Sequence, residues 1–584
     1  MLGGFIYWTF GCLDRPILKS AGVALALATL SASSAPPAMA GALTPSLVQT
    51  DEGPVQGFGK NGITEFLGIP YAAPPVGNLR WMPPVKHAPW KQVLQATAFA
   101  PICAQITTLG VFAGPPNNNE DCLYLNVFTP GSSKGDAVGR GRELPVIFWI
   151  HGGGNVDGEA NDYDGSKLAS QGNTVVVTIN YRLGLLGFFA HPAIDGEGHL
   201  FANYGLLDQQ FALKWVQNNI ARFGGDPDNV TVGGQSAGSN NTEAHVMSPL
   251  SRGLFNHAIF QSVLAEPSTL AAAEANGTAF AVAAGCGSGT TPTVANCLRN
   301  LSVSQIMALQ GTVGASGPYV VDPDGLISDG QILPSVTFAS AIKAGQFNHV
   351  PIISGTTEDE LIFELAIEEY FENPRVPFTA ANYNATIASF TGLEGIYGSG
   401  TYPAGTPAAV QSRYPLNAYS TPELALDRIT TDPLECEQRA INKLFASQVP
   451  VYAYEFDDRT APSYFPAMPG LQMLAYHTGD IQYLFPLYHG GPQGIVHQLH
   501  GQQERLSDEL VAAWTNFAWT GNPNGRIRLA AMQPGIGGYW PRYAPNMPST
   551  PSILSENIPA LSVFTDTQFA TAHQCNFWDS TLTY

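Results

Sequence analysis

A serine flanked by glycines follows a short β-branched run near the middle of the chain. The segment Gly234-Gln-Ser-Ala-Gly238 comes directly after a predicted strand, Val230-Thr-Val232, and precedes a segment that can form a helix. A sharp turn between a strand and a helix needs small residues two positions either side of the serine, because the backbone bends there and other elements pack closely. Such a turn would present the Ser236 hydroxyl at its tip, where it could act as a nucleophile.

A second glycine-rich segment follows another predicted strand. His151-Gly-Gly-Gly154 stands at the end of the run Val146–Ile150. Three glycines after a buried strand expose backbone N–H groups to one shared point, which a developing oxyanion requires. The alternative is a nucleotide-binding loop, but the G-x-G-x-x-G spacing is missing and no G-K-[ST] follows. Together the two segments predict a serine nucleophile beside an oxyanion-binding loop.

These segments need a scaffold that positions them, and the apolar runs predict a buried sheet. Continuous apolar strands of this length are typical of a parallel sheet that is buried on both faces. The runs cover residues 144–150, 174–179, 229–232, 258–260, 350–353 and 451–456. Helical patterns lie at 206–215 and 508–517, and the second begins with two acidic residues, which suit a helix N-terminus. The alternation predicts an α/β fold, with a large, mostly parallel central sheet and helices on both faces.

No fixed-period repeat and no low-complexity linker divides the chain. The stretches from about 265 to 341 and from about 382 to 432 are predicted to be long, helical excursions on the α/β core. We therefore expect residues 41–584 to form a single catalytic domain.

The first forty residues have the pattern of a cleavable signal peptide. Arg15 and Lys19 precede an apolar run from Ala21 to Leu30, and Ala38-Met-Ala40 has the A-x-A form of a signal-peptidase site. Ten apolar residues cannot cross a membrane core of about 30 Å, and no later segment reaches the roughly 18 uninterrupted apolar residues of a membrane helix. We expect cleavage after Ala40, a secreted or periplasmic product, and no stable membrane insertion.

The chain is acidic and lightly charged. It has 26 Lys and Arg against 46 Asp and Glu, a net charge of −20, and only 12% charged residues beside 45% hydrophobic ones. An acidic surface repels phosphate backbones, so we expect no nucleic-acid partner. Disorder would need more charge and less hydrophobicity.

Cysteine usage indicates disulfides. Of seven cysteines, Cys12 falls in the predicted signal peptide, which leaves an even number in an exported product. Six cysteines allow 15 pairings, among which spacing alone does not choose.

Further segments make a resemblance to a known family specific. Glu120-Asp-Cys-Leu-Tyr-Leu-Asn-Val127 is similar to the second signature of the type-B carboxylesterases, the α/β-hydrolases that include cholinesterases and some fungal lipases. Other stretches typical of that family are 66–72, 77–81, 203–210 and 223–227, and the matches run from about Val48 to Trp578. The resemblance implies the α/β-hydrolase fold, with helical excursions over an active-site gorge, and hydrolysis of carboxylic esters without a metal or other cofactor.

The resemblance also assigns partners to Ser236. The segment Gly355–Glu360 resembles the one that bears the catalytic acid, which gives Glu360 that role, and His477–Phe485 resembles the one that bears the catalytic histidine, His477. The order serine, glutamate, histidine is that of α/β-hydrolases. The remaining roles implied are oxyanion-binding N–H groups on Gly153, Gly154 and Ala237, and support of the acid by Ser262.

The chain departs from the family pattern at several positions near these residues. Glu358 and Asp359 adjoin the assigned acid, and Leu361 stands where the family usually has glycine, so the acid could lie one or two positions away. Gln235 replaces the usual glutamate beside the nucleophile, and Asn155 replaces the usual aromatic residue after the glycines. Neither replacement removes a catalytic atom.

The resemblance resolves the cysteine pairing and narrows the substrate. It implies Cys103–Cys122, Cys286–Cys297 and Cys436–Cys575. The first loop, residues 104–121, has Phe112 as its only aromatic residue and no tryptophan. This disfavours choline esters, because family members that bind quaternary ammonium use a tryptophan there.

The short, weakly apolar loop favours soluble esters of small or medium size. A lipase acting on longer-chain acylglycerols is the closer alternative, and a catalytically inactive adhesion-type member is the more distant one. We expect a small-molecule ester as the partner of a monomer or weak homo-oligomer.

Overall fold

A computed structural model describes most of the chain between residues 45 and 581. The described residues are 45–107, 110–111, 115–131, 143–263, 266–310, 325–390, 405–491, 493–524 and 540–581. The predicted signal peptide and Phe112 lie outside these residues.

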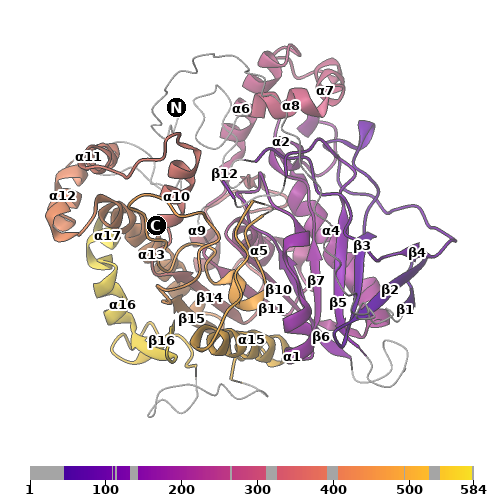
Figure 1. Ribbon diagram of the computed structural model, residues 1–584. Coiled ribbons are helices and arrows are strands. Elements are labelled where there is room, and N and C mark those ends of the chain that lie inside the picture. The colour runs from indigo at the N-terminus through magenta and orange to yellow at the C-terminus, as the bar shows by residue number, and fades with distance from the viewer. Residues whose placement is uncertain are drawn as a thin grey trace, which may run out of the picture.

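One large sheet runs through the described residues (Figure 1). Its thirteen strands are β1 (Pro45–Gln49), β2 (Pro54–Lys60), β3 (Ile63–Pro70), β4 (Leu94–Gln95), β5 (Tyr124–Pro130), β6 (Leu144–Ile150), β7 (Val175–Ile179), β10 (Gly225–Gln235), β11 (His257–Gln261), β14 (Ile352–Thr357), β15 (Val451–Phe456), β16 (Pro551–Glu556) and β17 (Ser562–Thr565). They follow the order β1-β2-β3-β5-β7-β6-β10-β11-β14-β15-β16-β17, and β4 pairs with β2. Two small sheets pair β8 (Phe188–Phe189) with β9 (Ala202–Asn203), and β12 (Ser268–Thr269) with β13 (Ile327–Ser328).

The middle of the large sheet is parallel. All neighbours from β7 through β6, β10, β11, β14 and β15 to β16 run parallel. Strands β1, β2, β3 and β5 on one side and β17 on the other are antiparallel to their neighbours along the sheet. Every residue of β7, β14 and β15 is buried, as expected for strands covered on both faces. The prediction of a large, mostly parallel sheet is confirmed.

Helices cover both faces of the sheet (Figure 1). They are α1 (Ser166–Gly172), α2 (Gly184–Gly187), α3 (Pro192–Asp195), α4 (Tyr204–Asn219), α5 (Ala237–Met247), α6 (Leu270–Ala283), α7 (Pro292–Arg299), α8 (Val303–Gln310), α9 (Phe338–Lys343), α10 (Ile362–Phe371), α11 (Ala380–Ser389), α12 (Thr406–Arg413), α13 (Pro422–Ala446), α14 (Ile481–Leu484), α15 (Gln502–Thr520), α16 (Asp566–Ala572) and α17 (Cys575–Thr581).

Alternation along β6 shows how the two faces are filled. Phe148 and Ile150 belong to one hydrophobic core together with apolar residues of α4 and α13. Ile147 and Trp149 belong to the other core, with apolar residues of α1 and α15. Successive side chains of a strand point to opposite faces, so a continuous apolar run requires cover on both. The α/β architecture with helices on both faces is confirmed.

The helical excursions fall where the sequence predicts them, but one helix begins earlier than expected. Helices α6 to α9 lie in or next to the stretch 265–341, and α11 and α12 lie in or next to 382–432. Helix α15 begins at Gln502, after Gly501 with φ +61°, rather than at Asp508. The residues of the helix before Leu506 are polar and have no apolar periodicity, so the sequence pattern did not predict the first turn.

Three disulfides cross-link the described residues, two over short separations and one over a long separation. Cys103 pairs with Cys122, Cys286 with Cys297, and Cys436 with Cys575 across 139 residues, the pairs that the family resemblance implies. The last one ties α13 to α17. Among the helices of the described residues, none combines the length and the hydropathy of a membrane span.

Candidate active site

Ser236 occupies the sharp turn between β10 and α5. Its backbone has φ +57° and ψ −130°, a conformation that a residue with a side chain adopts only where the surroundings enforce it. Hydrogen bonds hold this turn on both sides. The Ser236 N–H donates to Gln261 O at 2.9 Å, and Ser239 N and Asn240 N donate to Ser236 O at 2.7 and 3.0 Å.

The glycines on either side of Ser236 are required by close packing against the end of β6. A Cβ atom on Gly234 would lie 2.5 Å from the carbonyl oxygens of Gly238 and Ile150. A Cβ on Gly238 would lie 2.1 Å from the same Ile150 oxygen. Real Cβ atoms do not approach oxygen so closely. The spacing of the two glycines therefore reflects a steric requirement of the turn.

The glycine-rich loop after β6 packs directly on this turn. A Cβ on Gly152 would lie 3.0 Å from Ser236 Cβ. Gly153 and Gly154 have φ values of +106° and +58°, in the region that favours glycine. Among the described residues, no hydrogen bond is donated by the backbone N–H of Gly153, Gly154 or Ala237. These three N–H groups are not consumed by the fold, as an oxyanion-binding role requires.

Asn155 connects the glycine-rich loop to α5. Its φ is +54°, a left-handed conformation that asparagine tolerates better than most residues. Its side-chain oxygen accepts hydrogen bonds from Asn241 on α5 at 2.8 Å and from the Tyr181 hydroxyl at 3.2 Å. The single hydroxyl proton of Tyr181 is shared between this oxygen and His151 O, which lies 2.9 Å from the hydroxyl oxygen. Asparagine at this position therefore fixes the loop through hydrogen bonds.

Glu360 and His477 form a buried hydrogen-bonded pair. Glu360 follows β14, and His477 precedes α14. The His477 Nδ1–H donates to Glu360 Oε2, while Glu360 Oε1 accepts a bond from Thr357 N at 2.8 Å. The backbone N–H of His477 also donates to Glu360 O at 3.2 Å. The imidazole is thus held by both the side chain and the main chain of one residue.

The acidic neighbours of Glu360 are engaged elsewhere. Asp359 bonds to Arg459 at 2.9 Å and to Arg428 at 3.2 Å. Glu358 bonds to Arg428 at 3.0 Å. Of the three adjacent carboxylates, the structure brings Glu360 to His477 and directs the other two to arginines.

The surroundings of His477 favour its charged form. Burial alone would lower the pKa of His477, but the negative charge of Glu360 and the hydrogen bond to it outweigh this and raise the pKa above its usual value. Asp480 lies nearby and contributes in the same direction. Burial raises the pKa of Asp480 itself to about 6, although Gln261 Nε2 donates to its carboxylate at 2.6 Å. Sequence reasoning did not single out Asp480, although it lies in the segment matched for His477.

The other face of the imidazole contacts a residue that was not assigned a role. The side-chain nitrogen of Gln235 lies 3.1 Å from His477 Nε2 and 3.4 Å from Nδ1. The hydrogen bonds of the described residues include none between Ser236 and His477. Catalytic hydrogen bonds are often long or poorly aligned before substrate binds. The departure from glutamate at position 235 thus places an uncharged amide against the imidazole.

The predicted contact between Ser262 and the acid is not formed in the structure. Ser262 is buried at the end of β11 with φ +60°, and its N–H donates to Gly355 O at 2.8 Å. Its hydroxyl has no hydrogen-bond partner among the described residues. Support of Glu360 by Ser262 stays a prediction.

Metal-ligand spacing occurs elsewhere in the described residues. The one group of described residues with this spacing consists of Glu435, Glu455 and His573. None of the three is a residue assigned to the candidate active site. The candidate site itself offers a nucleophile, a base with a buried acid, and free N–H donors, which together suit acyl transfer.

Comparisons with known proteins agree with this chemistry. A family model described as the carboxylesterase family matches residues 44–578. The chain is 34% identical to the fumonisin B1 esterase of Sphingopyxis macrogoltabida, over 91% of each chain. It is 34% identical to the acylcarnitine hydrolase of Mus musculus over 80% of each chain, and 33% identical to the para-nitrobenzyl esterase of Bacillus subtilis over 82% of this chain and 91% of the relative.

The similarity extends to solved structures. One PNB esterase structure aligns with a TM-score of 0.69 and 28% sequence identity, covering 91% of this chain and all of the other. A thermophilic PNB esterase aligns with a TM-score of 0.70 and 29% identity, again over 91% of this chain.

Proposed function

Because the chain belongs to the carboxylesterase family and is a carboxylic ester hydrolase, we propose that it cleaves esters with a Ser236-His477-Glu360 triad. The observation that carries the proposal is the buried hydrogen bond from His477 Nδ1 to Glu360, on an imidazole that also contacts Gln235, the residue before the strained Ser236. The glycine-rich loop packed on that turn supports the same mechanism.

In the first half of the reaction, Ser236 Oγ attacks the ester carbonyl carbon while His477 Nε2 accepts its proton. Nε2 exchanges its contact with Gln235 for one with Ser236 in this step. Glu360 keeps Nδ1 protonated and stabilises the imidazolium. The N–H groups of Gly153, Gly154 and Ala237 bind the oxyanion, each contributing about 3 kcal/mol to transition-state stabilisation. The tetrahedral species collapses as the imidazolium protonates the leaving alkoxide.

In the second half, water cleaves the acyl-enzyme through the same groups. His477 accepts a proton from water as the oxygen attacks the acyl carbon. The oxyanion accepts hydrogen bonds from the same N–H groups, and Ser236 Oγ recovers its proton from His477 as the carboxylic acid product leaves. The products are one alcohol and one carboxylic acid.

The substrate of this reaction is a soluble carboxylic ester of small or medium size. The names of two relatives, an acylcarnitine hydrolase and a para-nitrobenzyl esterase, refer to small-molecule esters and support this size class. Three disulfides support maturation in an oxidising compartment. The proposal therefore includes removal of residues 1–40, secretion or export to the periplasm, and a single catalytic domain over residues 41–584.

The nucleophile can be tested by substitution and by covalent labelling. Ser236→Ala should lower kcat for p-nitrophenyl acetate by at least about 10⁴-fold and abolish labelling by an organophosphate ester. Ser239→Ala is the matched control, since Ser239 is a buried serine three residues along. The Ser239→Ala enzyme should keep the wild-type kcat and should still be labelled by the organophosphate ester. Peptide mass spectrometry should find the label on Ser236, and a folded Ser236→Ala enzyme that turns over normally would overturn the assignment.

A further inference from the structure

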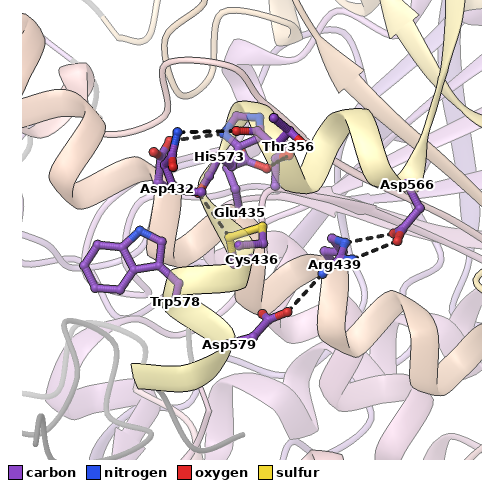
Figure 2. Close-up of a disulfide and its surroundings, with 12 residues drawn as sticks. Thr356, Asp432, Glu435, Cys436, Arg439, Asp566, His573, Trp578 and Asp579 are labelled. Atoms are coloured by element: carbon purple, nitrogen blue, oxygen red, sulfur yellow. Dashed lines mark hydrogen bonds and ion pairs between the residues drawn. A yellow bond between two sulfur atoms is a disulfide. The ribbon is translucent and has the colours of Figure 1, made fainter. Parts of the chain in front are cut away.

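A second buried group of ionisable side chains lies between α13, β15 and the turn that joins α16 to α17. Glu435 comes from α13, Glu455 from β15, and His573 from the end of α16. The three residues are 0%, 6% and 1% exposed. One potential ligand atom from each lies within 4.8 Å of the other two. Figure 2 shows Glu435 and His573 beside the disulfide of Cys436, between α13 and the C-terminal helices.

The imidazole of His573 is oriented by carboxylates on both sides. Its Nδ1 lies 3.2 Å from Asp432 Oδ1, one turn before the disulfide on α13. Its Nε2 lies 2.5 Å from Glu455 Oε1. In metal sites, a ligating histidine donates its second N–H to a carboxylate or carbonyl, which fixes the ring. Asp432 is placed to accept that bond and to direct Nε2 toward Glu455 and Glu435.

Glu435 has an oxygen that the described residues leave unsatisfied. Its Oε2 accepts a bond from the Thr356 hydroxyl at 2.5 Å, whereas its Oε1 is buried and has no hydrogen-bond partner among these residues. A buried carboxylate without a partner is costly, so the group needs a proton or a cation.

Three carboxyl groups surround the imidazole of His573. Glu435, Glu455 and Asp432 bring three carboxylates to one imidazole. The guanidinium of Arg428 approaches Asp432 at 3.6 Å, but it also binds carboxylates of the segment before Glu360. When Glu435 and Glu455 are both ionised as ligands, one divalent cation would balance their charges.

We propose that Glu435, Glu455 and His573 bind one divalent transition-metal ion, for which Zn²⁺ is the probe. One imidazole nitrogen and two carboxylate oxygens suit Zn²⁺, whereas Ca²⁺ prefers ligands that are all oxygen. Bonds of about 2.0–2.1 Å place tetrahedral ligands about 3.3 Å apart. Metal binding therefore releases to solvent the proton between His573 Nε2 and Glu455 Oε1, and these two atoms move apart by about 0.8 Å.

The ion has a structural role at this place in the fold. Its ligands join α13, β15 and the turn before α17, and none of them acts in the proposed ester hydrolysis. Glu435 precedes Cys436, and His573 stands two residues before Cys575. The metal would therefore cross-link α13 to the C-terminal segment by coordination, beside the disulfide that links them covalently.

The experiment uses tag-free, disulfide-intact enzyme stripped with a chelator. After titration with Zn²⁺ and gel filtration, inductively coupled plasma mass spectrometry should find one tightly bound Zn²⁺ per chain. The melting temperature should be higher with Zn²⁺ than without it. Glu435→Gln keeps the side-chain volume and should weaken Zn²⁺ binding at least 100-fold in calorimetry. Glu437→Gln, the same substitution two residues along α13, is the matched control and should bind as the wild type does.

Two results would overturn the proposal. One is a wild-type enzyme that retains no stoichiometric Zn²⁺, and the other is a Glu435→Gln enzyme that binds it as tightly as the control. If Glu435→Gln does not fold, His573→Gln serves as the second variant with the same expected loss. Metal content and unfolding are the readouts, so failure here is distinguishable from failure of the triad.

Discussion

Replacing Glu360 with glutamine tests how much of the catalysis depends on the buried charge beside His477. Both side chains are nearly inaccessible, at 0% and 3% exposure. Glutamine keeps the volume and can still accept the bond from Thr357 N, but it removes the charge that stabilises the imidazolium. Leaving one member of a buried ion pair unpaired costs about 3–5 kcal/mol. If that cost appears in the transition state, kcat falls by about 10² to 10⁴-fold.

The assay is steady-state hydrolysis of a p-nitrophenyl ester across pH, with Asp359→Asn as the comparison. Asp359 is the adjacent buried carboxylate, and it binds Arg459 and Arg428 rather than His477. Its substitution should lower kcat/KM by less than about tenfold, because it touches no reacting group. It should lower the melting temperature more than Glu360→Gln does, because two arginines lose a buried partner.

The two variants distinguish Glu360 from Asp359 as the carboxylate that serves His477. If Asp359→Asn loses as much activity as Glu360→Gln, the carboxylate that serves His477 is not the one proposed. A folded Glu360→Gln enzyme within tenfold of wild type would show that the charge has little effect on the imidazolium.

The raised pKa of His477 should place the midpoint of the rise in kcat/KM with pH above about 6.5, since the base must be neutral, and a midpoint at or below that value would contradict it. Gly238→Ala would place a Cβ 2.1 Å from Ile150 O, so kcat/KM should fall at least tenfold in a folded enzyme; unchanged kinetics would show that the turn can relax. Serines at both Cys436 and Cys575 should lower the free energy of unfolding in urea by up to about 5 kcal/mol, given the 139-residue separation, and no change would argue against the loop-entropy account.

The parts of the fold that the sequence predicts are those with a strong local signal. Val146–Ile150 is apolar throughout, which only a strand covered on both faces can satisfy. The antiparallel margins were not predicted, since strands such as Ser562–Thr565 are half-buried and lack a clear pattern. The first turn of the helix at Gln502–Thr520 was missed for a similar reason, because its polar start has no apolar period.

The candidate site divides in the same way. Ser236 and its flanking glycines lie in one short segment. Close packing requires glycine two positions either side of the serine, so the pattern can be recognised in the sequence. The contact of Gln235 with His477 joins residues 242 positions apart, and no pattern along the chain encodes it. The same holds for Glu455 and His573, which are 118 positions apart and meet only after α16 has docked. Family motifs indicated His477 and Glu360. The contacts that no family motif describes became visible only in the folded structure.

The Cys436–Cys575 disulfide also has a consequence for the order of events during synthesis. The covalent loop that it closes contains His477, so the proposed general base lies inside a ring that can close only after residue 575 has been synthesised. The strands that carry Ser236 and Glu360 can pair while the later part of the chain is still being made. A chain that ends before residue 575 would therefore contain the proposed nucleophile, Ser236, without the closed loop around His477, the proposed base.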